Sequence, residues 1–242
     1  MSHSNNTRVN RYCETNEQLE TVHTLRRRFF DDYRSQIEQG KFAVEDVRRV
    51  RTDNGWLSQF LYRWDYDLDT TLPGLIECLK WRNEFGVNHL SILSLKPYFD
   101  KQILYLHRKD RKGSRLLWFN VRNHRKDYPE KELQSLLIYW LERQNRERQG
   151  EKVVIIFDMF NSGLQNMDLD LIKFLLHALK FYYPSLLDYL LVYEIPWILN
   201  AAWKLIRSWM DATAQKKIVF VNQISIHEHI DSDFLPAHMG GS

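Results

Sequence analysis

The segment Val153–Phe157, of sequence VVIIF, limits the fold of this 242-residue chain more than any other. It is short, rich in β-branched residues and apolar at every position, which is typical of a central strand in a parallel sheet. Two further strands are predicted at Leu190–Tyr193 and Lys217–Val221, with helical segments between the three. This alternation of strands and helices predicts an α/β lobe with a mostly parallel sheet.

Shorter patterns supply the other elements of this lobe. Strands are predicted at Ile103–His107 and Leu116–Val121, and helices at Pro129–Gln149 and Asp168–Tyr183. Each helix is followed at once by a glycine or a proline, the residues that most often end helices.

Upstream of this lobe, apolar residues recur at helical spacing. Helices are predicted at Glu17–Gln39 and at Thr71–Phe85. A further helix is predicted to begin at Asp53-Asn54-Gly55 and to carry Trp56, Leu57, Phe60 and Leu61 on one side. Pro73 would then lie in the first turn of the helix Thr71–Phe85, where proline is tolerated. These patterns predict an N-terminal region made only of helices.

Three regions are therefore expected along the chain. Residues 1–16 are polar and lack the apolar region of a secretory signal, so we expect them to be disordered or derived from an expression vector. Residues 17–88 would form the helical N-terminal lobe, and residues 89–242 the α/β lobe.

The composition excludes several classes of protein. With 34 basic and 31 acidic residues the net charge is only +3, so the chain is not a general polyanion binder. Cys13 and Cys78 form neither a disulfide framework nor a zinc site, and they fit a reducing, cytoplasmic compartment. No run of about 18 uncharged apolar residues is present, so we expect no segment that spans a bilayer.

Motifs of catalysis and metal binding are missing from the sequence. It has no GxSxG, GxxxxGK[ST], GxGxxG or HExxH pattern. Asp158 ends a predicted strand, but no second carboxylate follows it, so we expect a capping role. His227 and His229 are two residues apart, which favours a surface segment over a metal site. We therefore expect no catalytic residue, no metal ligand and no cofactor.

Positive charge gathers between Arg108 and Lys126. This stretch holds eight basic residues, and its one acid is Asp110. Two interpretations remain open: a solvated hairpin edge that is basic to discourage strand pairing, or attraction to anionic lipid head groups. Nucleic acid is not expected as a partner, because aromatic residues are not interleaved with these charges.

The segment Trp197–Met210 forms an amphipathic helix in projection. At about 100° per residue, eight apolar residues fall within an arc of about 160°, beside a basic edge of Lys204 and Arg207. Such a face either covers a core or contacts lipid. The apolar arc contains Leu205, Ile198, Trp209, Ala202, Ile206, Leu199, Met210 and Trp203.

Four segments carry a resemblance to a known family. Phe60–Val87, Val153–Gly163, Lys180–Val221 and Phe234–Gly241 resemble segments of the CRAL-TRIO lipid-binding family. The resemblance implies a CRAL-TRIO-like α/β lobe whose mobile gate helix, at Pro196–Met210, covers an apolar cavity over the sheet. In that family the gate encloses one hydrophobic ligand and opens at a membrane, and no bond is broken.

The resemblance also implies two sets of site residues. The set expected to bind lipid is Phe119, Phe157, Phe174, Ala178, Tyr193, Ala202, Leu205, Ile206 and Trp209. The set expected to contact the membrane is Trp197, Ile198, Leu199, Trp203, Lys204, Arg207 and Met210. The expected partners are a phospholipid or other hydrophobic ligand and the surface of a membrane or lipid droplet. No residue identifies a protein partner.

Departures from the family pattern affect the expected ligand. Members that transfer phosphatidylinositol carry a Glu about ten residues before the proline that corresponds to Pro184. Phe174 occupies that position here, which argues against phosphatidylinositol. Phe157–Asp170 and Pro196–Ala202 resemble members that continue into a cytosolic major-sperm-protein domain and a membrane anchor. That likeness implies a location at the cytosolic face of the endoplasmic reticulum.

The function expected is therefore lipid binding or lipid transfer without catalysis. The alternative is a module that docks a larger protein on membranes or lipid droplets and transfers no lipid. Richness in Trp, a residue of membrane interfaces, favours this alternative.

Overall fold

A computed structural model describes residues 15–241 of the chain. Of residues 1–16, predicted to be disordered or vector-derived, 1–14 lie outside this range, and Thr15 and Asn16 cap and begin the first helix. Contacts divide the described residues into two compact units, of which the first holds residues 15–88 and Glu147–Glu151 and the second holds the rest. Each unit is described separately, and the predicted division into two domains stays a prediction.

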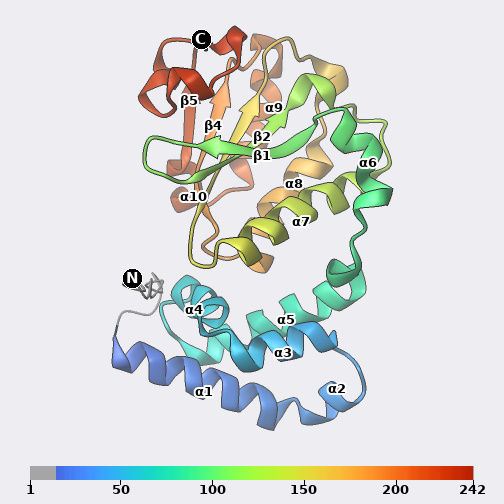
Figure 1. Cartoon of the computed structure of the whole chain (residues 1–242), viewed down its shortest axis with the longest axis vertical. Helices are drawn as coiled ribbons and strands as arrows, with labels where there is room; N and C mark the ends of the chain where they lie inside the picture. Colours follow the sequence, from blue (N-terminus) through green and yellow to red (C-terminus); the bar gives the residue numbers. More distant parts are fainter. Residues whose placement is uncertain (1–14, 242) are drawn as a thin grey trace, which may run out of the picture. The chain divides into compact units, whose positions relative to one another are not determined.

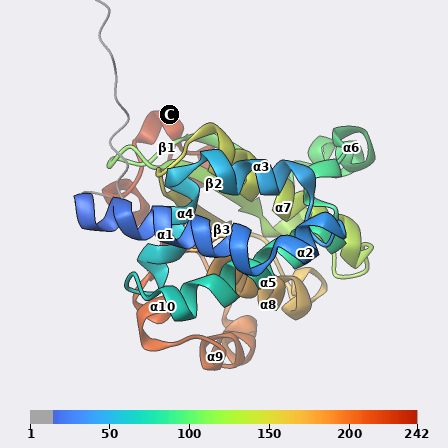
Figure 2. The same cartoon turned by 90° about the horizontal axis from the view of Figure 1, so that it is seen from below.

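The first unit is helical. Figure 2 shows α1 across α4 and α5, which are its main contacts. A buried ion pair joins α3 to α5, where the guanidinium of Arg82 lies 2.9 Å from the carboxylate of Asp46. The helices of this unit are α1 (Asn16–Asp32), α2 (Arg34–Glu38), α3 (Val44–Thr52), α4 (Asn54–Arg63) and α5 (Leu68–Phe85).

Two predictions for this unit are wrong in detail. The predicted helix Glu17–Gln39 is divided at Tyr33, which has non-helical backbone angles. Helix α5 begins at Leu68, because Asp67 accepts a hydrogen bond from the N–H of Asp69 and caps the helix there. Pro73 therefore lies beyond the first turn.

The second unit is built on a five-stranded sheet (Figure 1). The strands follow one another in space in chain order. Strand β1 is antiparallel to β2 and all other pairs are parallel, so the prediction of an α/β fold with a mostly parallel sheet is confirmed. The strands are β1 (Leu104–Lys109), β2 (Arg115–Asn120), β3 (Val153–Asp158), β4 (Leu187–Tyr193) and β5 (Ile218–Val221).

Alternating side chains give this sheet two different faces. Trp118, Ile156 and Leu191 belong to a buried cluster that includes the C-terminal segment, drawn red in Figure 1. That segment consists of the short 3-10 helices Ser225–Glu228, Ser232–Phe234 and Ala237–Met239. Both faces of β3 are covered, as its sequence predicts, because all six of its residues are buried.

Helices provide the other elements of this unit. They are α6 (Ile92–Asp100), α7 (Glu130–Glu147), α8 (Leu169–His177), α9 (Asn200–Ser208) and α10 (Ala212–Lys216). A π-helical turn, Ala178–Tyr182, extends α8, and a 3-10 helix, Trp197–Leu199, precedes α9. Within residues 15–241, no helix has the length and apolar character that a membrane span requires.

Candidate apolar cavity

An apolar cavity lies between the sheet, α8 and α9. It contains about 550 Å³ of space between the atoms, part of which is open to solvent. Every residue that lines it is aliphatic, aromatic or methionine. These residues are Phe157, Met159, Met167, Ile172, Leu175, Leu176, Leu190, Val192, Ile195, Leu199, Trp203, Ile206, Met210 and Ile218.

The floor of the cavity is one face of the sheet. Phe157 of β3 pairs in register with Val192 of β4, and paired residues of neighbouring strands share a face. Leu190, two residues before Val192, points the same way. From α8 come Ile172, Leu175 and Leu176, whose spacing of three and four residues places them on one side of the helix.

The cover of the cavity is α9 with its flanking residues. Leu199, Trp203, Ile206 and Met210 line the space, and their separations of four, three and four residues define one stripe of a helix. Trp203 also packs edge-on against Phe220 of β5, with 4.9 Å between ring centroids. The helix is thus held over the sheet mainly by apolar contacts.

The outer side of the same segment is also partly apolar. Trp197 is 82% exposed, Leu205 46% and Ile198 44%. Lys204 is exposed beside them, and the Nε of Arg207 donates a 2.9 Å hydrogen bond to the side chain of Gln215. The apolar arc is therefore divided between the cavity and solvent.

The start of α8 is fastened by a buried polar pair. Asp168 caps the helix, since its Oδ1 accepts a 2.8 Å hydrogen bond from the N–H of Leu171. Its Oδ2 lies 3.2 Å from Nε2 of His124, which is buried. Burial lowers the pKa of His124, and the nearby Asp168 carboxylate opposes this shift. This pair fixes the wall of the cavity that α8 provides.

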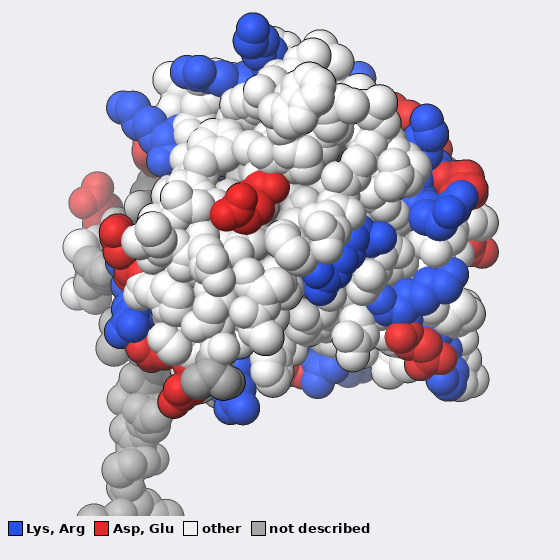
Figure 3. Space-filling model, turned by 90° about the horizontal axis from the view of Figure 1, so that it is seen from above, with Lys and Arg blue, Asp and Glu red and all other residues white. Residues whose placement is uncertain are grey.

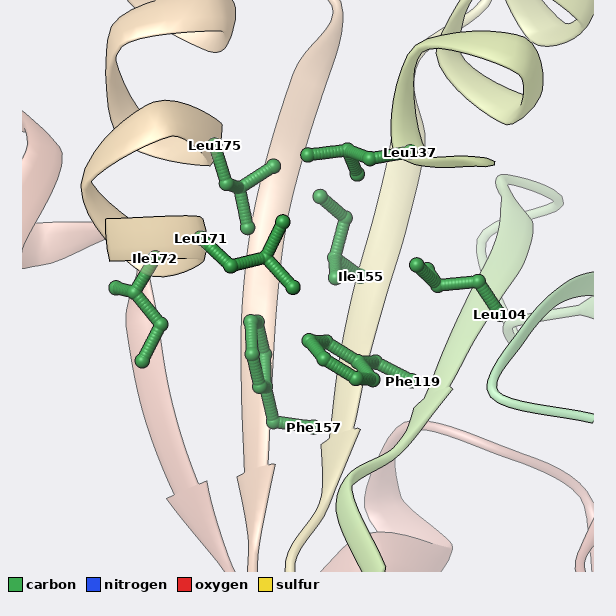
Figure 4. Close-up of a pocket in the computed structure, with 8 residues that line it drawn as sticks. All are labelled: Leu104, Phe119, Leu137, Ile155, Phe157, Leu171, Ile172 and Leu175. Carbon is green, nitrogen blue, oxygen red and sulfur yellow. The ribbon is translucent and has the colours of Figure 1, made fainter. Parts of the chain in front are cut away.

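The residues expected to bind lipid fall into three groups. Phe157 and Ile206 line the cavity. Phe119 lines a second, smaller void of about 270 Å³ between the sheet, α7 and α8, which shares Phe157 with the first (Figure 4). The remaining residues of the expected set do not line either space, and their contact with lipid stays a prediction. They are Phe174, Ala178, Ala202, Leu205 and Trp209, whereas Tyr193 lies on the other face of the sheet.

Tyr193 lies on the opposite face of the sheet from Phe157. It belongs to the cluster around Trp118 and Ile156, and its hydroxyl donates a 2.9 Å hydrogen bond to the carbonyl of His238. The expectation that Tyr193 and Phe157 line one cavity is therefore corrected. Register explains the difference, because Tyr193 pairs with Asp158 rather than with Phe157.

The set expected to contact the membrane is also divided. Leu199, Trp203 and Met210 line the cavity in this conformation. Trp197, Ile198, Lys204 and Arg207 are exposed.

Several residues that line the cavity are not predicted from the sequence. Leu190 and Val192 could be found from strand alternation, but only with the register known. Ile172, Leu175 and Leu176 lie on a helix that is apolar almost all round, so spacing alone does not show which side faces the cavity. Met159, Met167 and Ile195 lie outside strands and helices, and no periodic signal marks them.

Several basic side chains of the hairpin between β1 and β2 contact other residues of the second unit. Arg111 lies 2.6 Å from the carboxylate of Asp231, and Arg108 stacks over Phe234. Lys112 lies over the ring of Tyr189. These contacts hold the hairpin to the rest of the unit and favour a structural role for this part of the basic cluster.

The two other polar candidates make internal contacts. Asp158 accepts a 3.2 Å hydrogen bond from the N–H of Phe160, as a turn cap does, and its Oδ2 lies 2.9 Å from Nε2 of His238. Nδ1 of His227 lies 3.1 Å from the hydroxyl of Ser232. Among the residues that the structure describes, no group of three or more His, Cys, Asp or Glu side chains could hold a metal ion.

A mostly parallel sheet with an apolar cavity beneath an amphipathic helix is typical of domains that can enclose apolar ligands. The family model of the CRAL/TRIO domain matches residues 99–241. The chain therefore belongs to the CRAL/TRIO domain family, and the predicted resemblance is confirmed at the level of the family.

Curated relatives agree with this assignment. A CRAL-TRIO domain-containing protein of Schizosaccharomyces pombe is 23% identical over 78% of this chain and 45% of its own length. The phosphatidylinositol transfer protein CSR1 of Eremothecium gossypii is 29% identical over 54% of this chain and 31% of its own. The chain thus spans less than half of these two relatives. The Sec14 cytosolic factor of S. pombe is 26% identical, with 79% of this chain and 76% of that protein covered.

A solved structure shares the fold. The crystal structure of Sfh5 matches with a TM-score of 0.69 at 15% sequence identity, and the match covers 95% of this chain and 88% of that one. At this identity the likeness supports the fold alone.

Proposed function

We propose that this chain binds a phospholipid or another hydrophobic ligand under α9 and transfers it between membranes without chemical conversion. The observation that carries the proposal is the cavity lined only by apolar and aromatic residues beneath an amphipathic helix. A space lined only by uncharged apolar side chains suits an acyl chain, and its lining offers no group for acid–base chemistry.

The relatives support a phospholipid as the ligand. One of them is named a phosphatidylinositol transfer protein, and the family resemblance implies lipid exchange. The half-buried Phe174 stands where phosphatidylinositol-transferring members carry a Glu, so we propose a phospholipid other than phosphatidylinositol. A cytoplasmic location at membrane surfaces, including the cytosolic face of the endoplasmic reticulum, follows from the proposed likeness to the CRAL-TRIO domain of motile sperm domain-containing protein 2.

The first test is lipid mass spectrometry on protein that is re-isolated after incubation with vesicles of mixed lipids. One lipid class close to one molecule per chain would support the proposal. Leu176→Trp should fill the cavity and abolish retention, because Leu176 lines it and is half-buried. Asp170→Trp is the matched control, since it places the same ring at an exposed position of α8. Equal retention by both variants would contradict the assignment of the cavity.

A second function has its own supporting observation. The exposed apolar side chains of Trp197, Ile198 and Leu205 would suit a module that only docks on a membrane or lipid droplet. Transfer of labelled lipid from donor to acceptor vesicles separates the two functions. A carrier moves lipid, whereas a docking module co-sediments with vesicles and moves none.

A further inference from the structure

Three exposed apolar side chains lie in the loops that follow neighbouring strands. Leu164 is 56% exposed and follows β3, Trp197 is 82% exposed and follows β4, and Ile224 is 84% exposed and follows β5. Because β2 to β5 are parallel, these loops emerge at one edge of the sheet, the carboxyl edge. This edge lies at the top of Figure 1.

Side-chain hydrogen bonds fix the turns of two of the three loops. Around Ile224, the side chain of Asn222 accepts 2.9 Å hydrogen bonds from the N–H groups of Ile224 and Ser225. Before Leu164, the N–H of Gly163 donates a 2.9 Å hydrogen bond to the side chain of Asn166. The side chains of Leu164 and Ile224 thus lie on hydrogen-bonded turns, and the described residues leave more than half of each exposed.

Hydrogen bonds also tie the start of two of these loops to the end of the neighbouring strand, and one bond joins two loops directly. The N–H of Met159 donates to the carbonyl of Tyr193, and the N–H of Glu194 donates to the carbonyl of Val221; both hydrogen bonds are 3.1 Å long. On the other side, the side chain of Asn166 donates a 2.7 Å bond to the carbonyl of His124. The loops of this edge are therefore anchored to the sheet or to one another where they begin.

Charge and position identify what this surface fits. Figure 3 shows it from above: most of the middle is uncharged, one cluster of acidic side chains lies there, and Lys and Arg side chains lie around it. The loop after β2 adds Lys126, which is exposed and whose N–H bonds to the carbonyl of Gln165, next to Leu164. The cavity reaches the same edge, since Met159 and Ile195 line it directly after β3 and β4.

We infer that this edge, with Leu164, Trp197 and Ile224 inserted and Lys126 beside them, is the surface that docks on an anionic membrane. Separate exposed apolar side chains with the basic Lys126 beside them fit an interface of lipid head groups and acyl chains. Docking there would bring the cavity to the bilayer. The inference rests on the proposed lipid function and adds Leu164 and Ile224 to the membrane-contacting residues.

The test is co-sedimentation with vesicles of phosphatidylcholine and phosphatidylserine. Leu164→Asp and Ile224→Asp should each weaken binding about tenfold or more, because each removes an inserted apolar side chain and adds a negative charge. Val44→Asp is the matched control, since Val44 is 75% exposed and belongs to the helical unit. Lys126→Gln should reduce binding to these vesicles and leave binding to pure phosphatidylcholine unchanged.

A label provides an independent readout. A polarity-sensitive dye on Ile224→Cys, in a background with Cys13 replaced, should shift to shorter wavelengths on vesicles. Cys78 is buried and should not react. No shift, or binding of both Asp variants equal to that of Val44→Asp, would overturn the inference.

The outcomes separate this inference from the proposed function. Lipid retained by the chain together with unchanged docking of both variants would overturn the docking edge and leave the carrier function standing. Absence of both retained lipid and vesicle binding would overturn both. Self-association without vesicles that Ile224→Asp abolishes would assign the edge to a second copy of the chain instead, and would overturn membrane docking.

Discussion

Removal of the carboxylate of Asp168 should destabilise the wall of the cavity more than loss of a helix cap alone can explain. Asp168 has two roles, as the N-cap of α8 and as the neighbour of the buried His124. Loss of an N-cap costs about 1 kcal/mol. A buried polar group that loses its partner costs about 1–3 kcal/mol more. We therefore expect Asp168→Ala to lower the free energy of unfolding by about 2–4 kcal/mol.

The chain contains a matched control for this variant. Asp211 caps α10 in the same way, since its Oδ1 accepts a hydrogen bond of the same length, 2.8 Å, from the N–H of Ala214. Its second oxygen lies 3.9 Å from Lys180 in an ion pair about half exposed, which contributes at most about 1 kcal/mol. Asp211→Ala should therefore cost about 1–2 kcal/mol. The difference between the two variants isolates the contact with His124.

Urea unfolding, followed by circular dichroism, measures both free energies in the same buffer. The loss for Asp168→Ala should exceed that for Asp211→Ala by about 1–2 kcal/mol. Lipid retention should fall only in Asp168→Ala, because α8 lines the cavity and α10 does not. Equal losses of stability in the two variants would refute the view that the His124–Asp168 pair fastens α8.

Three further predictions test other contacts. Burial lowers the pKa of His124 below 6.5, so below that pH the unfolded chain binds a proton at this histidine more readily than the folded chain does, and the free energy of unfolding should fall as the pH drops. His124→Asn should flatten this dependence in urea titrations from pH 8 to pH 5. Asp46→Ala should cost about 3–5 kcal/mol by leaving Arg82 buried without its carboxylate, whereas the exposed Glu45→Ala should change stability little. Phe220→Ala removes an aromatic contact of α9, worth about 0.5–1.5 kcal/mol, and should speed lipid release about two- to tenfold if α9 is the gate.

The sheet could be predicted because its signals are local. Val153–Phe157 is apolar at every position, and the structure covers both faces of β3. The face to which a residue belongs is not a local property. Between Val153 and Ile155 the pairing with β4 shifts from Leu187 to Leu190, so β4 holds one extra residue over that stretch. This irregularity decides that Val192 rather than Tyr193 shares a face with Phe157.

For the amphipathic helix too, the local sequence does not determine which side chains face the cavity. A helical projection finds the apolar arc of Trp197–Met210, but an arc of about 160° is wider than the stripe that one neighbour covers. The structure turns Leu199, Trp203, Ile206 and Met210 inward and leaves Leu205 and Ile198 outside. The choice depends on where the sheet and α8 lie, and this information is not in the helix.

The apolar side chains that α9 turns toward the cavity determine the free energy of opening the cavity in water and at a membrane. Leu199, Ile206 and Met210 are at most 9% exposed, and each would be worth about 1.5–3 kcal/mol when moved into water. An opening in water would therefore cost about 5–9 kcal/mol, which keeps the open state below about one molecule in a thousand. At a bilayer the same side chains enter hydrocarbon, and most of this cost disappears. A gate of this composition would thus remain closed in water and open at membranes, so a carrier would retain its lipid between them.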